Sequence, residues 1–86
     1  MDYDQLKYRP ISANLIIELE GYEGQPGADV RRMCHVAHAC ALSASGEPIW
    51  PSLDAAMSDD FRHVKRCAET ALAKAGLLDP ELIAGN

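Results

Sequence analysis

The chain has 86 residues, of which 13 are acidic and 8 are basic, so its net charge is −5. That length suits one small domain, which buries roughly 60–65% of its unfolded surface. Because a nucleic-acid footprint needs a basic stripe, the acidic balance argues against nucleic acid as the main partner. The apolar fraction of 48% excludes disorder throughout. Much of it is alanine, so we expect modest stability, which self-association or a partner increases.

The cysteines and the first residues indicate a cytoplasmic protein. Cys34, Cys40 and Cys67 are an odd number, and we interpret them as reduced thiols in a cytosol. The first four residues are acidic where a signal peptide is basic, and no apolar run approaches transmembrane length, so no membrane partner is expected. We expect a loosely ordered arm over 1–9, one helical domain over 10–84 and a tail at 85–86.

The first predicted helix runs from the N-cap Ser12 to about Tyr22. One face of it carries four large side chains: Leu15, Ile16, Leu19 and Tyr22. The Gly-Gln-Pro-Gly turn at 24–27 ends this helix.

A second helix is predicted from Val30 to about Ser43, with Asp29 as its N-cap. Helical spacing directs one set of side chains to the core: Val30, Met33, Cys34, Ala37 and Cys40 with Ala41. The other side carries Arg31, Arg32 and His35, which we expect to face solvent.

The third main helix follows an apolar turn over 46–51, in which Gly46 suits a left-handed conformation. Ser52 suits the cap of a short turn over 53–57, and Ser58 with the two aspartates after it opens the longer helix. Its predicted core stripe is Phe61, Val64, Ala68, Ala71, Leu72 and Ala75. Gly76 ends it, and 80–83 suit a last short turn. The predicted fold is all-α: a small irregular bundle of three main helices plus one or two short helical turns.

Trp50, the one tryptophan of the chain, lies in the apolar turn and has two interpretations. As a core plug it seals the pair of helices on either side of the turn. As part of an exposed apolar spot with Ile49 and Leu53, it anchors a partner. In an oligomer the two interpretations merge, because a subunit contact is also a core.

Four metal-ligand side chains lie within the segment 34–40, Cys-His-Val-Ala-His-Ala-Cys. On a helix Cys34 and His38 share a face, but Cys40 points away, so a zinc site needs Cys67 or an outside ligand. We therefore expect buried thiols beside surface histidines, with no metal and no cofactor. Nucleophilic catalysis by Cys34 with His38 is not expected either, because a helix this small offers no pocket or oxyanion donors.

The acidic pairs and the basic clusters have structural explanations. Asp59-Asp60 fits helix capping and Glu18 with Glu20 fits a solvated face, so we predict no general acid/base pair and no enzyme. Two groups of cations are interpreted as solvated faces: Arg31 with Arg32, and Arg62, His63, Lys65 and Arg66. The alternative is a local positive patch for an acidic protein partner or, second, for nucleic acid.

Three segments together resemble the bacteriophage tail assembly chaperones. They are Asp29-Val30-Arg31-Arg32-Met33 at a helix start, Ser45-Gly46-Glu47-Pro48-Ile49-Trp50 in the turn, and Ala71-Leu72-Ala73-Lys74-Ala75-Gly76-Leu77 at a helix end. The turn is similar to the Gly-x-Pro-apolar-aromatic turn of that family. The matching stretch covers somewhat more than half of the chain. The segment 51–58 departs from the family by being more apolar, and the Cys/His string has no counterpart in it.

The resemblance implies a non-catalytic protein of the bacterial host cytoplasm that binds the helical tape-measure protein during tail assembly and forms homo-oligomers. The residues expected to contact the client are Trp50, Ile49, Leu53, Arg31 and Arg32, together with exposed positions on the first helix. One alternative is a small prophage-encoded regulatory or interaction module that uses the basic clusters. Another is a domain stabilised by metal on Cys34, His38 and Cys67. Apolar client binding tolerates salt, whereas charge-led binding weakens steeply with salt.

Overall fold

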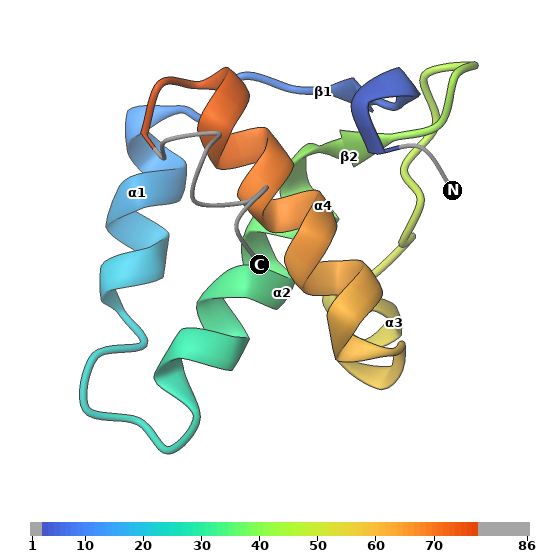
Figure 1. Cartoon of the computed structure of the whole chain (residues 1–86). Coiled ribbons are helices and arrows are strands. Elements are labelled where there is room, and N and C mark those ends of the chain that lie inside the picture. The colour runs from blue at the N-terminus through green and yellow to red at the C-terminus, as the bar shows by residue number, and fades with distance from the viewer. Residues whose placement is uncertain (1–2, 78–86) are drawn as a thin grey trace.

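The computed structural model describes residues 3–77. In chain order the elements of this range are η1 (Tyr3–Gln5), β1 (Lys7–Tyr8), α1 (Ala13–Glu20), α2 (Ala28–Cys40), β2 (Ala41–Leu42), α3 (Leu53–Ser58) and α4 (Phe61–Lys74). Helices α2 and α4 cross at the centre, with α1 on one side and the turn leading to α3 on the other (Figure 1). The expectation of a mostly helical fold is confirmed, but the small sheet means that the fold is not purely all-α.

The core lies mainly between α2 and α4. Its largest fully buried side chains are Val36, Val64, Cys40 and Cys67. Along α4 the buried positions 64, 67, 68 and 71 follow the i, i+3, i+4, i+7 pattern, which confirms the predicted stripe in its centre. Small buried alanines lie on both helices, Ala37 on α2 and Ala68 and Ala71 on α4, and Ala41 follows directly after α2.

Residues 3–9 form regular structure, although a loosely ordered arm was expected over 1–9. Strand β1 pairs antiparallel with β2, with Lys7 opposite Leu42 and Tyr8 opposite Ala41. The Arg9 N–H extends this ladder by donating to the Cys40 carbonyl at 2.9 Å. Because β2 begins directly after Cys40, α2 ends there and not near the predicted position 43.

The first two helices begin and end close to the predicted positions. Ser12 caps α1 as predicted, since its Oγ accepts from the Leu15 N–H at 3.1 Å, but α1 ends at Glu20. The N-cap of α2 is Gly27, with φ of +68°, so the prediction of Asp29 as the cap is wrong. Asp29 lies in the first turn instead and pairs with Arg32 at 3.3 Å.

The last two helices show the same pattern of small corrections. Ser52 caps α3 as predicted, its Oγ accepting from the Ala55 N–H at 3.1 Å. Helix α4 is capped by Asp60, because Ser58 still belongs to α3. At its other end Gly76 has φ of +78°, and bonds from Gly76 N–H to the Ala73 carbonyl and from Leu77 N–H to the Leu72 carbonyl form a Schellman motif. The predicted turn at 80–83 lies outside the described residues.

Four side chains predicted on core faces are exposed, one of them the small Ala75. Ile16 is 37% exposed, Val30 46% and Phe61 40%. Val30 and Phe61 lie in the first turn of their helices, beyond the crossing of α2 and α4, where the core no longer covers them. Conversely, Val36 was not among the predicted core residues of α2 but is 2% exposed. The real core face of α2 is therefore wider than the predicted stripe.

Candidate functional site

The turn between β2 and α3 carries Trp50 into the interior. Ser43 N–H donates to the Glu47 carbonyl at 2.7 Å, and Ile49 N–H donates to the Ala41 carbonyl at 3.2 Å, so the turn folds back on β2. Gly46 at its tip has φ of +89°, which confirms the predicted left-handed residue. The result is a Trp50 side chain that is only 4% exposed.

Trp50 is bound to elements on both sides of the core. Its indole Nε1–H donates to Asp59 Oδ2 at 2.9 Å, and its ring centroid lies 5.0 Å from that of His63 on α4. Its carbonyl accepts from His38 Nδ1 of α2 at 2.9 Å, which requires the Nδ1 proton on that ring. The indole hydrogen bond, helped by the Asp60 N–H, lowers the pKa of the Asp59 carboxyl. Trp50 thus acts as a core plug, as the first of its two interpretations has it.

Four large apolar side chains lie in the segment 49–61, which contains Trp50. Ile49 and Leu53 are half-buried against the core, while Met57 at the end of α3 is 42% exposed and Phe61 at the start of α4 is 40% exposed. We call these four residues together with Trp50 the Trp50 corner. Of the client contacts predicted here, Ile49 and Leu53 are partly exposed, whereas Trp50 is buried.

Most of the predicted basic groups are held by local contacts. Arg31 Nε–H donates to the Pro26 carbonyl at 3.0 Å, and Arg32 Nε–H donates to the Leu19 carbonyl at 3.1 Å, so both arginines close the loop between α1 and α2. Arg62 pairs with Asp60 at 2.9 Å, an exposed contact that lowers the pKa of the Asp60 carboxyl. Arg66 lies over the Tyr3 ring, 5.9 Å from its centroid. These contacts explain the arginines structurally.

The cysteines and histidines do not converge on a metal site. Within residues 3–77, no group of three or more His, Cys, Asp or Glu side chains is placed to hold a metal ion. All three cysteines are buried free thiols. Burial raises the pKa of Cys34 and of Cys40, and it raises the pKa of Cys67 to about 11. Such thiols are poor nucleophiles and poor metal ligands at neutral pH.

A second polar cluster, not foreseen from the sequence, joins α1 to α2. His35 Nε2 lies 3.0 Å from Glu18 Oε2, and His35 Nδ1 lies 2.8 Å from the Tyr22 hydroxyl. The Tyr22 and His35 rings meet edge to face, with centroids 5.6 Å apart. Glu18 and Tyr22 are four residues apart, a spacing that places them on one face, but nothing local in the sequence points to His35 as their partner.

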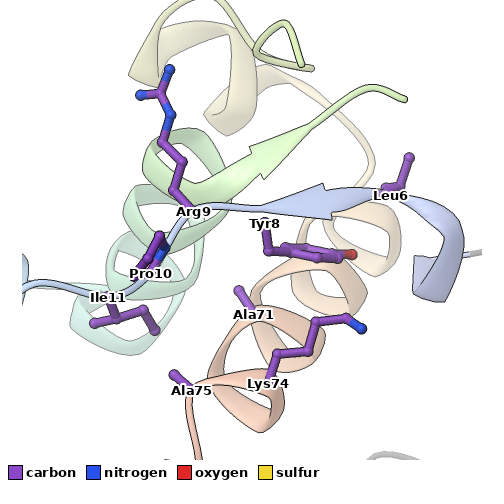
Figure 2. A pocket seen from close by; sticks show the side chains of 8 residues that line it. All are labelled: Leu6, Tyr8, Arg9, Pro10, Ile11, Ala71, Lys74 and Ala75. Carbon is purple, nitrogen blue, oxygen red and sulfur yellow. The ribbon is translucent and has the colours of Figure 1, made fainter. Parts of the chain in front are cut away.

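A shallow groove of about 440 Å³ lies between the segment 8–11 and the last turns of α4 (Figure 2). Its lining residues are Leu6, Tyr8, Arg9, Pro10, Ile11, Ala71, Lys74 and Ala75. Figure 2 shows the Arg9 side chain extending away from α4, while Lys74 lies beneath the Tyr8 ring, with Nζ 5.9 Å from its centroid. The lining of the groove therefore combines apolar side chains with two cations, Arg9 and Lys74.

Comparison with family models, with curated proteins and with solved structures finds no match to this chain. The resemblance to tail assembly chaperones therefore stays a hypothesis from the sequence. Among the described residues, no helix combines the length and the apolar character needed to cross a membrane.

Proposed function

We propose that the protein is a non-catalytic binding protein that shields amphipathic helices of a client. In its specific form the proposal is a tail assembly chaperone of the bacterial host cytoplasm, with the phage tape-measure protein as client. It acts as a homo-oligomer and uses no cofactor. The proposal of a tail assembly chaperone rests on the resemblance of the segments 29–33, 45–50 and 71–77 to that family. The broader proposal of a protein that binds a helical client rests on the exposed apolar side chains of the surface.

The observation that carries the proposal is the exposure of large apolar side chains at two places. Met57 and Phe61 are exposed at the Trp50 corner, and α1 exposes Ile16 and Ile17, the latter at 64%. Val30 and Leu77 are also exposed, but singly, which is ordinary on a protein surface, whereas Met57 with Phe61 and Ile16 with Ile17 lie close together in the sequence. A client helix covers such groups with its own apolar stripe.

The contacts of the arginines favour apolar over charge-led binding. Arg31, Arg32 and Arg62 each hydrogen-bond to a neighbouring carbonyl or carboxylate, so a bond within the protein already orients each guanidinium. Arg31 and Arg32 support the proposal indirectly, because they hold the loop between α1 and α2 in place and so fix the position of α1. We therefore assign the client contacts to the Trp50 corner and to α1.

The test is co-purification with a tape-measure protein from co-expressing cells. The Met57→Ser/Phe61→Ser double variant is expected to lose most of the bound client, because two apolar anchors become polar. Val30→Ser is the matched control, since Val30 is 46% exposed but belongs to neither group. Circular dichroism checks that each variant is folded.

Salt separates the two modes of binding. The complex is expected to persist in 1 M NaCl, where the Debye length falls to about 3 Å and charge-led contacts are screened. A complex that dissociates in salt and tolerates the double variant contradicts the proposal and favours the regulatory module. Light scattering of the free protein tests the homo-oligomer separately.

A further inference from the structure

The cluster of Glu18, His35 and Tyr22 has the geometry of an activated hydroxyl. The Tyr22 hydroxyl oxygen lies 2.8 Å from one ring nitrogen of His35, and a Glu18 carboxylate oxygen lies 3.0 Å from the other. The three side chains come from α1, from the loop after it and from α2, so the fold brings them together. Glu18 is 59% exposed and His35 20%, so the cluster lies at the surface.

The hydrogen-bond partners determine the proton positions. An ionised carboxylate only accepts, so His35 Nε2 carries the proton that bonds to Glu18. In the neutral ring Nδ1 is then unprotonated, and the Tyr22 hydroxyl donates to it. His35 is thus oriented as a general base toward Tyr22, with Glu18 holding the tautomer.

We propose that Tyr22 is a modification site, an activated phenol that accepts an acyl group from an activated acyl donor. In this step the Tyr22 oxygen forms a bond to the acyl carbon, and the bond from that carbon to the leaving group breaks. His35 Nδ1 takes the phenol proton and passes it to the leaving group or to water. Glu18 stabilises the imidazolium that forms in between. This reaction modifies the protein itself and is independent of client binding.

The chain offers two internal comparisons. Tyr3 also bonds to a histidine, with its hydroxyl 3.1 Å from His63 Nδ1, but within residues 3–77 no carboxylate is hydrogen-bonded to the His63 ring. Tyr8 donates its hydroxyl to the Tyr3 carbonyl at 2.8 Å, and burial raises its pKa, so it is the least reactive phenol expected. The three tyrosines thus differ in their partners: Tyr22 bonds to a histidine that is hydrogen-bonded to a carboxylate. Tyr3 bonds to a histidine that interacts with Asp59 and Asp60 through charge. Tyr8 bonds to a backbone carbonyl.

The experiment treats the native full chain with N-acetylimidazole, an activated acyl donor, and follows O-acetylation of each tyrosine by peptide mass spectrometry. Tyr22 is expected to react about 10-fold faster than Tyr3, below the 10²–10⁴-fold range of enclosed general bases because the site is open to water. Glu18→Gln is expected to remove part of this advantage and His35→Phe all of it. Glu20→Gln, an exposed acid on the same helix, is the matched control.

Each outcome decides the proposal. If Tyr22 reacts no faster than Tyr3 in the native chain, the proposal is overturned without any variant. If Tyr22 keeps its advantage in folded His35→Phe, exposure alone causes it, and the assignment of His35 as base is wrong. If His35→Phe loses α1 structure by circular dichroism, Glu18→Gln decides in its place. A client that still binds acetylated protein leaves the proposed function intact, so the two proposals fail separately.

Discussion

The α2–α4 pair and helix α1 are held in the molecule by different interactions. Between α2 and α4 the contact is apolar, with Val36 and Val64 at most 2% exposed. Helix α1 has one buried residue, Leu15, with the partly buried Leu19 also packed on the core, and polar bonds of His35 and Arg32 join it to α2. Buried apolar area stabilises by about 25 cal/mol per Å², whereas exposed polar contacts contribute little each.

This difference indicates that α1 is the less stable part of the fold. A helix with one buried side chain opens at lower free energy than the core that it covers. The loop that connects α1 to α2 contains two glycines with positive φ, Gly24 at +82° and Gly27 at +68°. The same helix carries two exposed isoleucines, so the least stable element also presents apolar surface.

The largest expected effect on stability tests the apolar contact between α2 and α4. Trp50→Ala is expected to cost about 3–5 kcal/mol, because it removes a buried aromatic side chain between α2 and α4 and leaves a cavity. Urea unfolding followed by circular dichroism measures it. Phe61→Ala, which truncates an aromatic that is 40% exposed, is the control and is expected to cost less than about 1 kcal/mol. Equal costs contradict the account of Trp50 as a core plug.

A second prediction tests whether α1 opens by itself. Leu15→Ala is expected to destabilise the packing of α1 by about 2 kcal/mol. Hydrogen exchange of amides 13–20 is then about 30-fold faster, since 1.4 kcal/mol corresponds to a factor of ten. Amides of α4 change less. Ile17→Ala, on the same helix but 64% exposed, is the control. Equal acceleration in α1 and α4 means that the two open together, and the comparison fails.

A smaller effect is expected at the helix caps. Ser12 and Ser52 make equivalent bonds of 3.1 Å at the starts of α1 and α3. Replacing either with alanine is expected to cost about 1 kcal/mol. For Ser12→Ala the loss is expected in the exchange of α1 amides, and Ser58→Ala, at an exposed position outside any cap, is the control. No change in α1 exchange shows that the cap does not limit its opening.

Local chemistry could be predicted from the sequence. Ser12, Ser52, Gly46 and Gly76 were placed correctly because a cap or a left-handed turn depends on residues within one turn of it. The stripe on α4 was correct in its centre for the same reason, since helical periodicity is local. Asp29 was not the cap because the left-handed Gly27, expected only as part of the preceding turn, already starts α2 two residues earlier.

Contacts between distant segments could not be predicted. Strands β1 and β2 are two residues each and lie 34 positions apart, from Lys7 to Ala41, so neither has a detectable alternation. The bond between Glu18 and His35 spans 17 positions and depends on how α1 lies on α2. The burial of Trp50 was one of two open interpretations, because only the tertiary fold decides whether an apolar turn faces inward.

The smallest expected effect concerns acid. The folded-state pKa of Asp59 is below its ordinary value of 3.8, so the ionised carboxylate stabilises the fold above that value. This stabilisation is lost as the pH falls through the folded-state pKa, when protonation weakens the bond from the indole. Trp50 fluorescence and urea midpoints, compared between pH 5 and pH 3, measure the loss.

Three variants separate the contributions to this change of stability with pH. Asp59→Asn keeps an acceptor for the indole and is expected to make the stability depend less on pH. Asp54→Asn, an exposed acid on α3, should leave it unchanged. Because the pKa of Asp60 is also lowered, by Arg62, Asp60→Asn separates its share. If Asp60→Asn alone removes the dependence, acid acts through the cap of α4, and the Trp50 corner is held by apolar burial alone.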